Sequence, residues 1–168
     1  MAAERAGRQL QAVGRLQALL EEHGIHSWLF GGWAVDFHAG RVTRDHDDID
    51  LAVWRTDLGR LDGLLRSEGW THHPEPDEDG YTGYERAGLR VEVAFLAVDE
   101  EGIVHTPLAD GRGDWPVGSF GDDVAEVGGV RARVVSRASL IEDKSGPRDD
   151  PAAAAKDRAD VATLTALG

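Results

Sequence analysis

The sequence predicts a mixed α+β domain in which a small mixed sheet is flanked by helices. Segments with helical spacing of apolar residues are interleaved with short segments in which apolar and polar residues alternate. Such an order is typical of helices packed on one sheet. Two strand-like segments joined at Ala87-Gly88 predict a β-hairpin, so the sheet should contain antiparallel pairs and should not be fully parallel. At 168 residues the chain has the length of one domain, and we expect a single unit over residues 1–168.

The first elements are expected to be a helix, a strand and a second helix. Residues 4–23 carry leucine and valine at helical spacing, and Gly24 follows as a typical C-terminal cap. Ser27–Phe30 is an apolar run of strand length. Residues 33–39 form the second predicted helix, which Gly40 ends.

A strand, a helix and the hairpin follow. Residues 48–54 alternate in side-chain character, which predicts a strand, and residues 58–68 place leucines on one helical face. Tyr81–Arg86 and Leu89–Val98 are the two strands of the hairpin. Residues 103–106 are expected to add a further short strand.

The last part of the chain is expected to hold a long loop, one strand and two helices. Residues 110–129 are rich in glycine and aspartate and should be mainly loop, whereas residues 130–135 have the pattern of a strand. The closing helices should occupy about residues 136–167. Ser136 is the expected cap of the first, and Pro151 lies in the first turn of the second.

The charge of the chain argues against nucleic-acid binding. There are 31 acidic and 18 basic residues, with a formal net charge of −13. Proteins that bind nucleic acids usually present a basic surface to the phosphates. A negatively charged cleft would instead concentrate a small cationic substrate, although solubility alone explains the same charge equally well.

Cysteine content and hydropathy narrow the class of protein further. The chain has no cysteine, which excludes disulfides, thiolate metal sites and cysteine nucleophiles. Residues 1–9 contain charges and no apolar signal core, and no apolar run approaches the ~20 residues of a membrane span. We therefore expect a cytoplasmic protein without membrane association.

The clearest candidates for chemistry are Asp48 and Asp50. Residues two apart on a strand point to the same face, so both carboxylates should project together while Ile49 points into the core. Two adjacent carboxylates resist ionising beside each other unless a cation lies between them. Mg²⁺ prefers oxygen ligands and is typically held by one or two carboxylates together with substrate phosphates. The structural alternative is a loop cap or an ion pair with Arg44.

Gly31 and Gly32 lie between a predicted strand and a predicted helix. Glycines at such a junction let the backbone approach a phosphate closely, and the start of a helix offers free N–H donors. A tight turn uses the same residues, so the pair gains its value from its position before the acidic strand. Together the two segments predict a phosphate site beside a metal site.

Glu92 is the candidate for a third carboxylate, because it is an acid within the otherwise largely apolar strand Leu89–Val98. If that strand lies beside the acidic strand, Glu92 can join the two aspartates. Three carboxylates can hold two metal ions, or two can hold metal while the third accepts a proton. An ion pair with Arg90 or Arg86 is the structural alternative.

These residues resemble the nucleotidyltransferase superfamily, whose pattern is a glycine pair opening a helix, an acid-x-acid strand and a third acid on a later strand. The runs WLFGGWAVD (28–36), GRVTR (40–44) and HDDIDL (46–51) are most similar to aminoglycoside 2''-adenylyltransferases and to small lincosamide nucleotidyltransferases. These families share a closing pattern like KDRADV at residues 156–161. The resemblance covers most of the chain and is strongest over residues 28–51.

The resemblance implies a nucleotidyltransferase fold and Mg²⁺-dependent transfer of a nucleoside monophosphate, with ATP as the expected donor. The implied acceptor is a hydroxyl group of a small aminoglycoside- or lincosamide-like antibiotic. It implies that Asp48 and Asp50 hold one or two Mg²⁺ ions and that Glu92 is a general base or a metal ligand. Gly31 and Gly32 would contact the nucleotide phosphates, and Arg44 would bind the triphosphate.

Several other residues have two candidate roles. Lys144, near a predicted helix end, would reach the phosphates or simply compensate the helix dipole. His46 would orient Asp48 or face solvent, and Trp33 should pack the helix rather than stack on a base. Lys156 and Asp160, four residues apart, should form a surface salt bridge.

Glu92 departs from the antibiotic-modifying relatives, which carry aspartate at this position, and this leaves other functions open. One is a catalytically silent nucleotide-binding module. Another is a minimal nucleotidyltransferase of a toxin–antitoxin or defence system that acts on a protein or RNA. A metal-dependent phosphohydrolase would need more spaced histidines than the chain offers. Residues 71–80 and 107–129 should select the acceptor, and a monomer and a homodimer are both compatible with the sequence.

Overall fold

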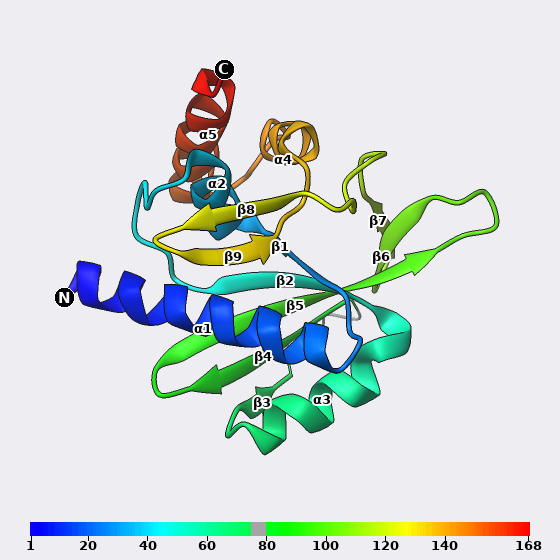
Figure 1. Ribbon diagram of the computed structural model, residues 1–168. Coiled ribbons are helices and arrows are strands. Elements are labelled where there is room, and N and C mark those ends of the chain that lie inside the picture. Colours follow the sequence, from blue (N-terminus) through cyan, green and yellow to red (C-terminus); the bar gives the residue numbers. More distant parts are fainter. Residues whose placement is uncertain (75–79) are drawn as a thin grey trace.

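The computed structural model describes residues 1–74 and 80–168, and it confirms the mixed α+β fold class. Helices precede, interrupt and follow a sheet that contains both parallel and antiparallel pairs (Figure 1). The elements are α1 (Ala2–Glu22), β1 (Ser27–Phe30), α2 (Gly31–Ala39), β2 (Ile49–Trp54), the 3-10 turn η1 (Arg55–Asp57), α3 (Leu58–Ser67), β3 (Thr71–His73), β4 (Tyr81–Arg86), β5 (Leu89–Val98), β6 (Val104–Leu108), β7 (Gly111–Asp114), β8 (Val124–Val127), β9 (Val130–Arg133), α4 (Arg137–Lys144) and α5 (Pro151–Ala166).

The described strands form one main sheet and one separate hairpin. The main sheet has the order β1-β2-β5-β4-β3, and β6 and β7 extend it from the far end of β5. β2 and β5 run parallel, whereas the neighbouring pairs β1–β2, β5–β4 and β4–β3 are antiparallel. The predicted β4–β5 hairpin is confirmed, and its turn places Ala87 and Gly88 at positive φ. Among the described strands, β8 and β9 pair only with each other and form a two-stranded antiparallel sheet.

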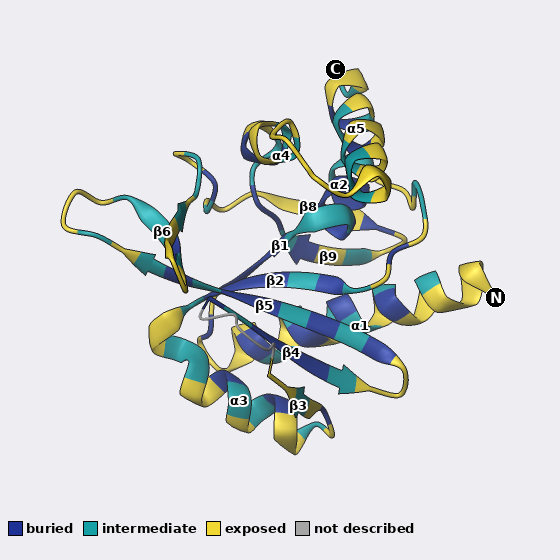
Figure 2. Cartoon of the chain, turned by 180° about the vertical axis from the view of Figure 1, so that it is seen from behind, coloured by how far each residue is buried: buried dark blue, intermediate teal, exposed yellow. Residues whose placement is uncertain are grey.

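Helices cover the sheet unevenly. α1 and α3 lie across one face of β2, β5 and β4, as Figure 1 shows, and the view from behind in Figure 2 shows the opposite face of β4 and β5 in front. α2, α4 and α5 gather beside β1, at the other end of the molecule from α3. On β5 the buried Val91 and Val93 therefore alternate with the half-buried Arg90 and Glu92 of the open face.

The core follows the predicted apolar pattern. Val13, Leu16 and Leu20 form the buried stripe of α1, and Ile49 of β2 is fully buried as expected. Trp33 of α2 is 1 % exposed, which confirms that it packs the interior. Within the part of the chain that the structure describes, no helix is long and apolar enough to cross a bilayer.

The segment 110–129 was expected to be mainly loop, and this expectation was wrong at two places. It contains β7, which pairs with β6, and β8, which pairs with β9 through a turn at Gly128-Gly129. Both strands are only four residues long. They are defined by pairing with a neighbouring strand, and the composition of so short a segment does not predict that pairing. The three-residue β3 was missed for the same reason, and residues 75–79 of the expected acceptor segment lie outside the described residues.

Candidate active site

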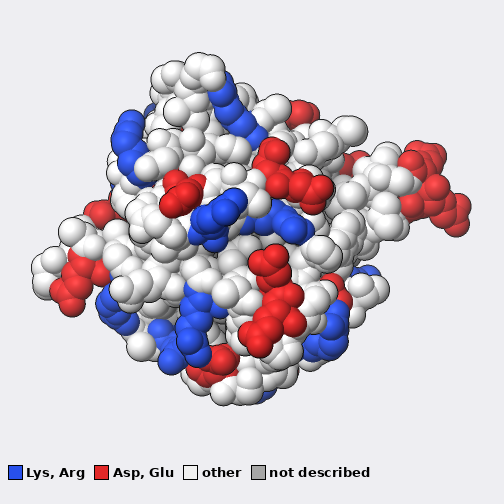
Figure 3. All heavy atoms as spheres, in the orientation of Figure 1, with Lys and Arg blue, Asp and Glu red and all other residues white. Residues whose placement is uncertain are grey.

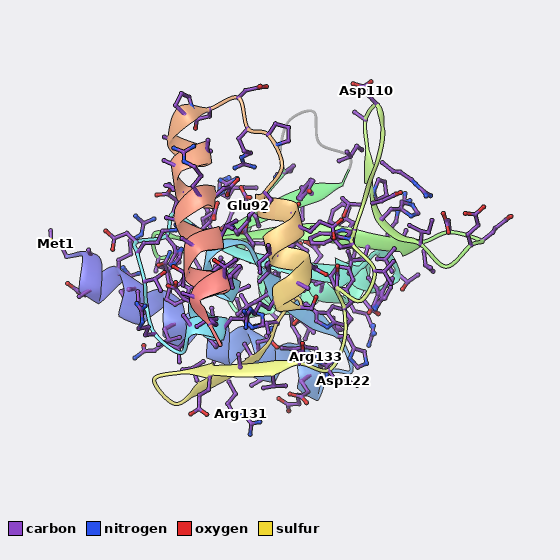
Figure 4. The ribbon with its side chains drawn as sticks, turned by 90° about the horizontal axis from the view of Figure 1, so that it is seen from above. Met1, Glu92, Asp110, Asp122, Arg131 and Arg133 are labelled. Atoms are coloured by element: carbon purple, nitrogen blue, oxygen red, sulfur yellow. The ribbon has the colours of Figure 1, made fainter. Side chains whose placement is uncertain are left out.

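Three acidic side chains, two from neighbouring strands and one from the residue before β2, meet at one edge of the sheet. Asp50 on β2 is the register partner of Glu92 on β5, and Asp48 directly precedes β2. One carboxylate oxygen from each of the three residues lies within 4.8 Å of the others. Among the described residues no other group of three potential ligands from His, Cys, Asp or Glu is placed this closely. Figure 4 shows Glu92 in the region between α4 and α5.

The three carboxylates are electrostatically strained without a cation. Burial, followed by the negative charges of Asp48 and Glu92, raises the pKa of Asp50 well above its ordinary value. Burial and the neighbouring Asp47 raise the pKa of Asp48. A divalent cation would favour the ionised forms, and three carboxylate oxygens are the hard ligands that Mg²⁺ prefers. The donor set therefore fits the metal that the sequence predicts.

The glycine pair makes room for this acidic segment. Gly31 has a φ of +67°, and a Cβ added there would overlap the Oδ2 atom of Asp50. A Cβ at Gly32 would lie 2.5 Å from both Nη2 of Arg44 and Nδ1 of His46. A side chain at either position would displace these neighbours, so packing alone favours glycine at both. The contact with nucleotide phosphates remains a prediction.

The start of α2 supplies backbone donors beside the carboxylates. The helix begins at Gly31, and its N-cap residue Phe30 provides no side-chain hydrogen bond. The first N–H groups of a helix have no partners within the helix, and they carry the positive end of its dipole. Phe30, Gly31 and Gly32 line the same cleft as the carboxylates, which has a volume of about 400 Å³. The start of α2 therefore offers N–H donors to an anionic group in this cleft.

Arg44 and Lys144, the two side chains predicted to bind phosphates, also line this cleft, and both contact Asp160 of α5. Arg44 donates from Nε and Nη2 to the two carboxylate oxygens of Asp160 at 3.0 and 2.9 Å. Lys144 lies 2.9 Å from Asp160 and 3.5 Å from Asp157. The structure therefore brings all seven predicted site residues to one cleft; their roles there remain predictions.

The expected surface salt bridge between Lys156 and Asp160 is wrong. Asp160 is 2 % exposed and faces inward to Arg44 and Lys144, whereas Lys156 reaches outward and pairs with Asp47 at 3.1 Å. The spacing of four residues along the helix suggested the pair of Lys156 and Asp160. In the folded chain Arg44 and Lys144 contact the buried carboxylate of Asp160 instead.

The expectation for His46 was also wrong, because its side chain is buried and bonds to a different acid. Nε2 of His46 lies 2.6 Å from Oδ2 of Asp36, and the imidazole packs on Trp33 with ring centroids 4.7 Å apart. Thr43 donates to the other carboxylate oxygen of Asp36, and Gln9 donates to the backbone oxygen of His46. This buried network anchors the loop that leads into Asp48. The part of Asp36 in this network was not predicted, since nothing but its place in the GGWAVD run marks it.

Glu92 also has the structural partner that was considered for it. Nε of Arg90 lies 3.5 Å from the Glu92 carboxylate, and the same guanidinium lies 3.5 Å from Glu85. The ion pair and a place in the carboxylate cluster are therefore compatible. The cleft is completed by residues of the loop before β2, of α4, of α5 and of the loop between these helices, namely His46, Asp47, Asp143, Arg148, Asp150, Ala152, Ala153, Lys156 and Asp157.

Comparison with known proteins matches most of the chain to one family. The model of the aminoglycoside-2''-adenylyltransferase family matches residues 12–164. The chain belongs to this family. The 2''-aminoglycoside nucleotidyltransferases of Escherichia coli and Klebsiella pneumoniae are 38% identical to it over 61 residues. That alignment covers 36% of this chain and 34% of each relative, so it spans about a third of the relatives' length.

Solved structures place this adenylyltransferase-family chain in the nucleotidyltransferase fold, as predicted. The crystal structure of ANT(2'')-Ia in complex with adenylyl-2''-tobramycin has a TM-score of 0.73 and 25% identity, covering 96% of this chain and 90% of that one. The lincomycin-bound lincosamide antibiotic adenylyltransferase LnuA has a TM-score of 0.70 and 17% identity, covering 90% of this chain and 92% of its own. The second likeness supports the fold alone.

Proposed function

We propose that this protein is a Mg²⁺-dependent nucleotidyltransferase that transfers AMP from ATP to a hydroxyl group of a small aminoglycoside- or lincosamide-like antibiotic. The observation that carries the proposal is the cluster of Asp48, Asp50 and Glu92, whose oxygens lie within 4.8 Å beside the start of α2. Membership of the aminoglycoside-2''-adenylyltransferase family supports the same reaction class.

The carboxylates are the proposed metal ligands. Asp48 and Asp50 would hold Mg²⁺, and Glu92 would either complete the metal site or act as the base. When bound, the metal neutralises negative charge on the triphosphate and on the leaving group. The N–H groups at Gly31 and Gly32, with Arg44 and Lys144, would orient the phosphates against it.

The chemical step is an in-line displacement at the α-phosphorus of ATP. The acceptor oxygen forms a bond to the α-phosphorus while the bond from that phosphorus to the bridging oxygen breaks, and pyrophosphate leaves. The proton of the acceptor hydroxyl goes to the Glu92 carboxylate in the version where Glu92 is the base. The side chain of Glu92 is 33% exposed, which leaves it accessible to an acceptor from the open face of the sheet.

The charge distribution supports a small acceptor rather than a nucleic acid. On the face shown in Figure 3, acidic and basic side chains are intermixed and form no continuous basic track. The turn between β5 and β6, which projects from the molecule in Figure 1, contains Asp99, Glu100 and Glu101. A chain with a net charge of −13 favours the approach of a cationic acceptor.

Mass spectrometry of candidate acceptors tests the proposal. A panel of aminoglycosides and lincosamides is incubated with the protein, Mg²⁺ and each nucleoside triphosphate in turn. We expect a nucleotidyl adduct on at least one compound, its absence with Asp50→Asn, and its retention with Asp45→Asn, which changes an exposed acid of the loop before β2. Magnesium-dependent ATP binding without any adduct would contradict the proposal and favour a silent module or another acceptor.

A further inference from the structure

Asp160 is a buried carboxylate that contacts two cations from separate parts of the chain. It lies on α5 and is 2 % exposed. Arg44, from the loop before β2, makes two hydrogen bonds to it, and Lys144, from the end of α4, lies 2.9 Å away. Arg44 and Lys144 both line the cleft, whereas Asp160 lies behind them and does not.

The arrangement solves an electrostatic problem. Arg44 and Lys144 carry like charges and contact the same carboxylate, so without Asp160 they would repel each other at short range. Burial alone would raise the pKa of Asp160, but the hydrogen bonds from Arg44 and Lys144 outweigh it and lower that pKa. The hydrogen bond to Asp160 likewise raises the pKa of Arg44. Asp160 and Arg44 are therefore both held in their charged forms.

The donor inventory shows what remains for a ligand. Arg44 uses Nε and one N–H of Nη2 on Asp160, and one N–H of Nη1 on the backbone oxygen of Asp45. A guanidinium has five N–H groups, which leaves two. An ammonium has three N–H groups, of which Lys144 directs one to Asp160 and one to Asp157, which leaves one.

We propose that Asp160 is the positioning residue of the nucleotide site, holding Arg44 and Lys144 together so that their remaining N–H groups bind the β- and γ-phosphates of a nucleoside triphosphate. This inference rests on the proposed function and assigns one residue a part in it. Asp160 touches neither substrate nor metal. Its effect is therefore selective for ligands that carry the outer phosphates.

The test compares binding of ATP and AMP, each with Mg²⁺, by isothermal titration calorimetry. In the wild-type protein we expect ATP to bind more tightly than AMP. Asp160→Asn keeps the shape of the side chain but removes its charge, and it should weaken ATP binding by about tenfold or more while AMP binding changes little. In turnover the KM for ATP should rise, with the KM for the acceptor unchanged.

A matched variant separates positioning from simple loosening of α5. Leu164 is fully buried on the same helix, and its aliphatic side chain cannot form an ion pair or hydrogen bond with either cation. Leu164→Val should lower the melting temperature but leave the ratio of ATP to AMP affinity unchanged. If Asp160→Asn does not fold, Asp160→Glu serves instead, because it keeps the charge but shifts the carboxylate by one methylene out of the paired hydrogen bonds with Arg44; it should reduce the same ATP preference.

The outcomes distinguish the two proposals. The positioning role is supported if the wild-type protein binds ATP more tightly than AMP and the Asp160→Asn protein does not. Wild-type and Asp160→Asn proteins with the same preference for ATP would overturn the role of Asp160 while the nucleotidyltransferase proposal stands. Wild-type protein that binds no nucleotide in the presence of Mg²⁺ would overturn both.

Discussion

Asp50 on β2 and Glu92 on β5 lie directly opposite each other in the parallel register of the two strands. This pairing brings together carboxylates that are far apart in the sequence, and Asp48 joins them from the residue before β2. The place where β1, β2 and the start of α2 meet is thus an acidic pocket with a helix N-terminus beside it.

Removal of one carboxylate should stabilise the metal-free protein while abolishing transfer. Asp50→Asn removes a buried charge that Asp48 and Glu92 disfavour, so the melting temperature without metal should rise. Each 1 kcal/mol of relief corresponds to roughly 2–4 °C in a chain of this size. Differential scanning calorimetry in EDTA measures this shift, with Asp45→Asn as the control. A lower melting temperature for Asp50→Asn would show that the carboxylates are not in conflict.

Two glycines with nearly the same φ should differ in their sensitivity to alanine. Gly31 and Gly40 have φ values of +67° and +73°, so alanine at either position adds backbone strain of about 1–2 kcal/mol. Only at Gly31 would the new Cβ also displace the carboxylate of Asp50, whereas nothing lies within 4 Å at Gly40. Gly31→Ala should therefore lose Mg²⁺-dependent nucleotide binding, and Gly40→Ala should keep it. Equal binding by both variants, measured by calorimetry, would refute the packing role of Gly31.

The stability of the metal-free protein should fall as pH rises from about 4 towards neutral. The pKa values of Asp48 and Asp50 are raised in the folded state, so the folded protein binds more protons than the unfolded chain above the ordinary carboxyl pKa of about 3.9. Their unfavourable contribution is absent at low pH and develops as pH rises through the raised values. Asp160 acts oppositely, but only as pH falls below about 3.9, because its pKa is lowered.

Addition of Mg²⁺ should reduce this decline, since the cation stabilises the ionised carboxylates and binds the folded state. Thermal unfolding across this pH range, with Mg²⁺ or with EDTA, measures both effects. Asp50→Asn should flatten the curve in EDTA. A stability that rises with pH throughout the range, unaffected by Mg²⁺, is the opposite of what the carboxylate cluster requires.

The buried pair of Asp36 and His46 should matter for stability and for the site. Asp36→Ala leaves Nε2 of His46 and the hydroxyl of Thr43 without their partner, which should cost about 1–3 kcal/mol. Urea unfolding measures the loss, and Asp45→Ala, an exposed change in the adjoining loop, should have little effect. Because His46 packs against Gly32, Asp36→Ala should also weaken nucleotide binding. A change within experimental error would mean that the pair is dispensable.

The sequence predicted those features that local pattern controls. Alternation on residues 48–54 correctly placed Ile49 in the core, and the spacing of Val13, Leu16 and Leu20 gave the buried face of α1. Short strands such as β7 and β8 were not predicted, because their pairing partners, and not their composition, define them. The elements that strong periodicity marks were thus found, and those that depend on tertiary pairing were not.

The site was predictable to a similar extent. The acid-x-acid spacing and the lone acid of β5 pointed to Asp48, Asp50 and Glu92, and their resemblance to a known pattern suggested that they meet. The buried position of the Asp160 side chain was not predictable, because helical spacing pointed to Lys156 as its partner. Only the folded chain brings Arg44 and Lys144 into contact with Asp160.

The most direct test of the central claim is electron paramagnetic resonance of Mn²⁺ as a Mg²⁺ substitute, titrated into the protein with a non-hydrolysable ATP analogue. We predict tight, nucleotide-dependent Mn²⁺ binding in the wild-type protein and in Asp45→Asn. Binding should be strongly reduced in Asp48→Asn and Asp50→Asn. Equal Mn²⁺ binding in all four proteins would contradict the assignment of the carboxylate cluster as the metal site.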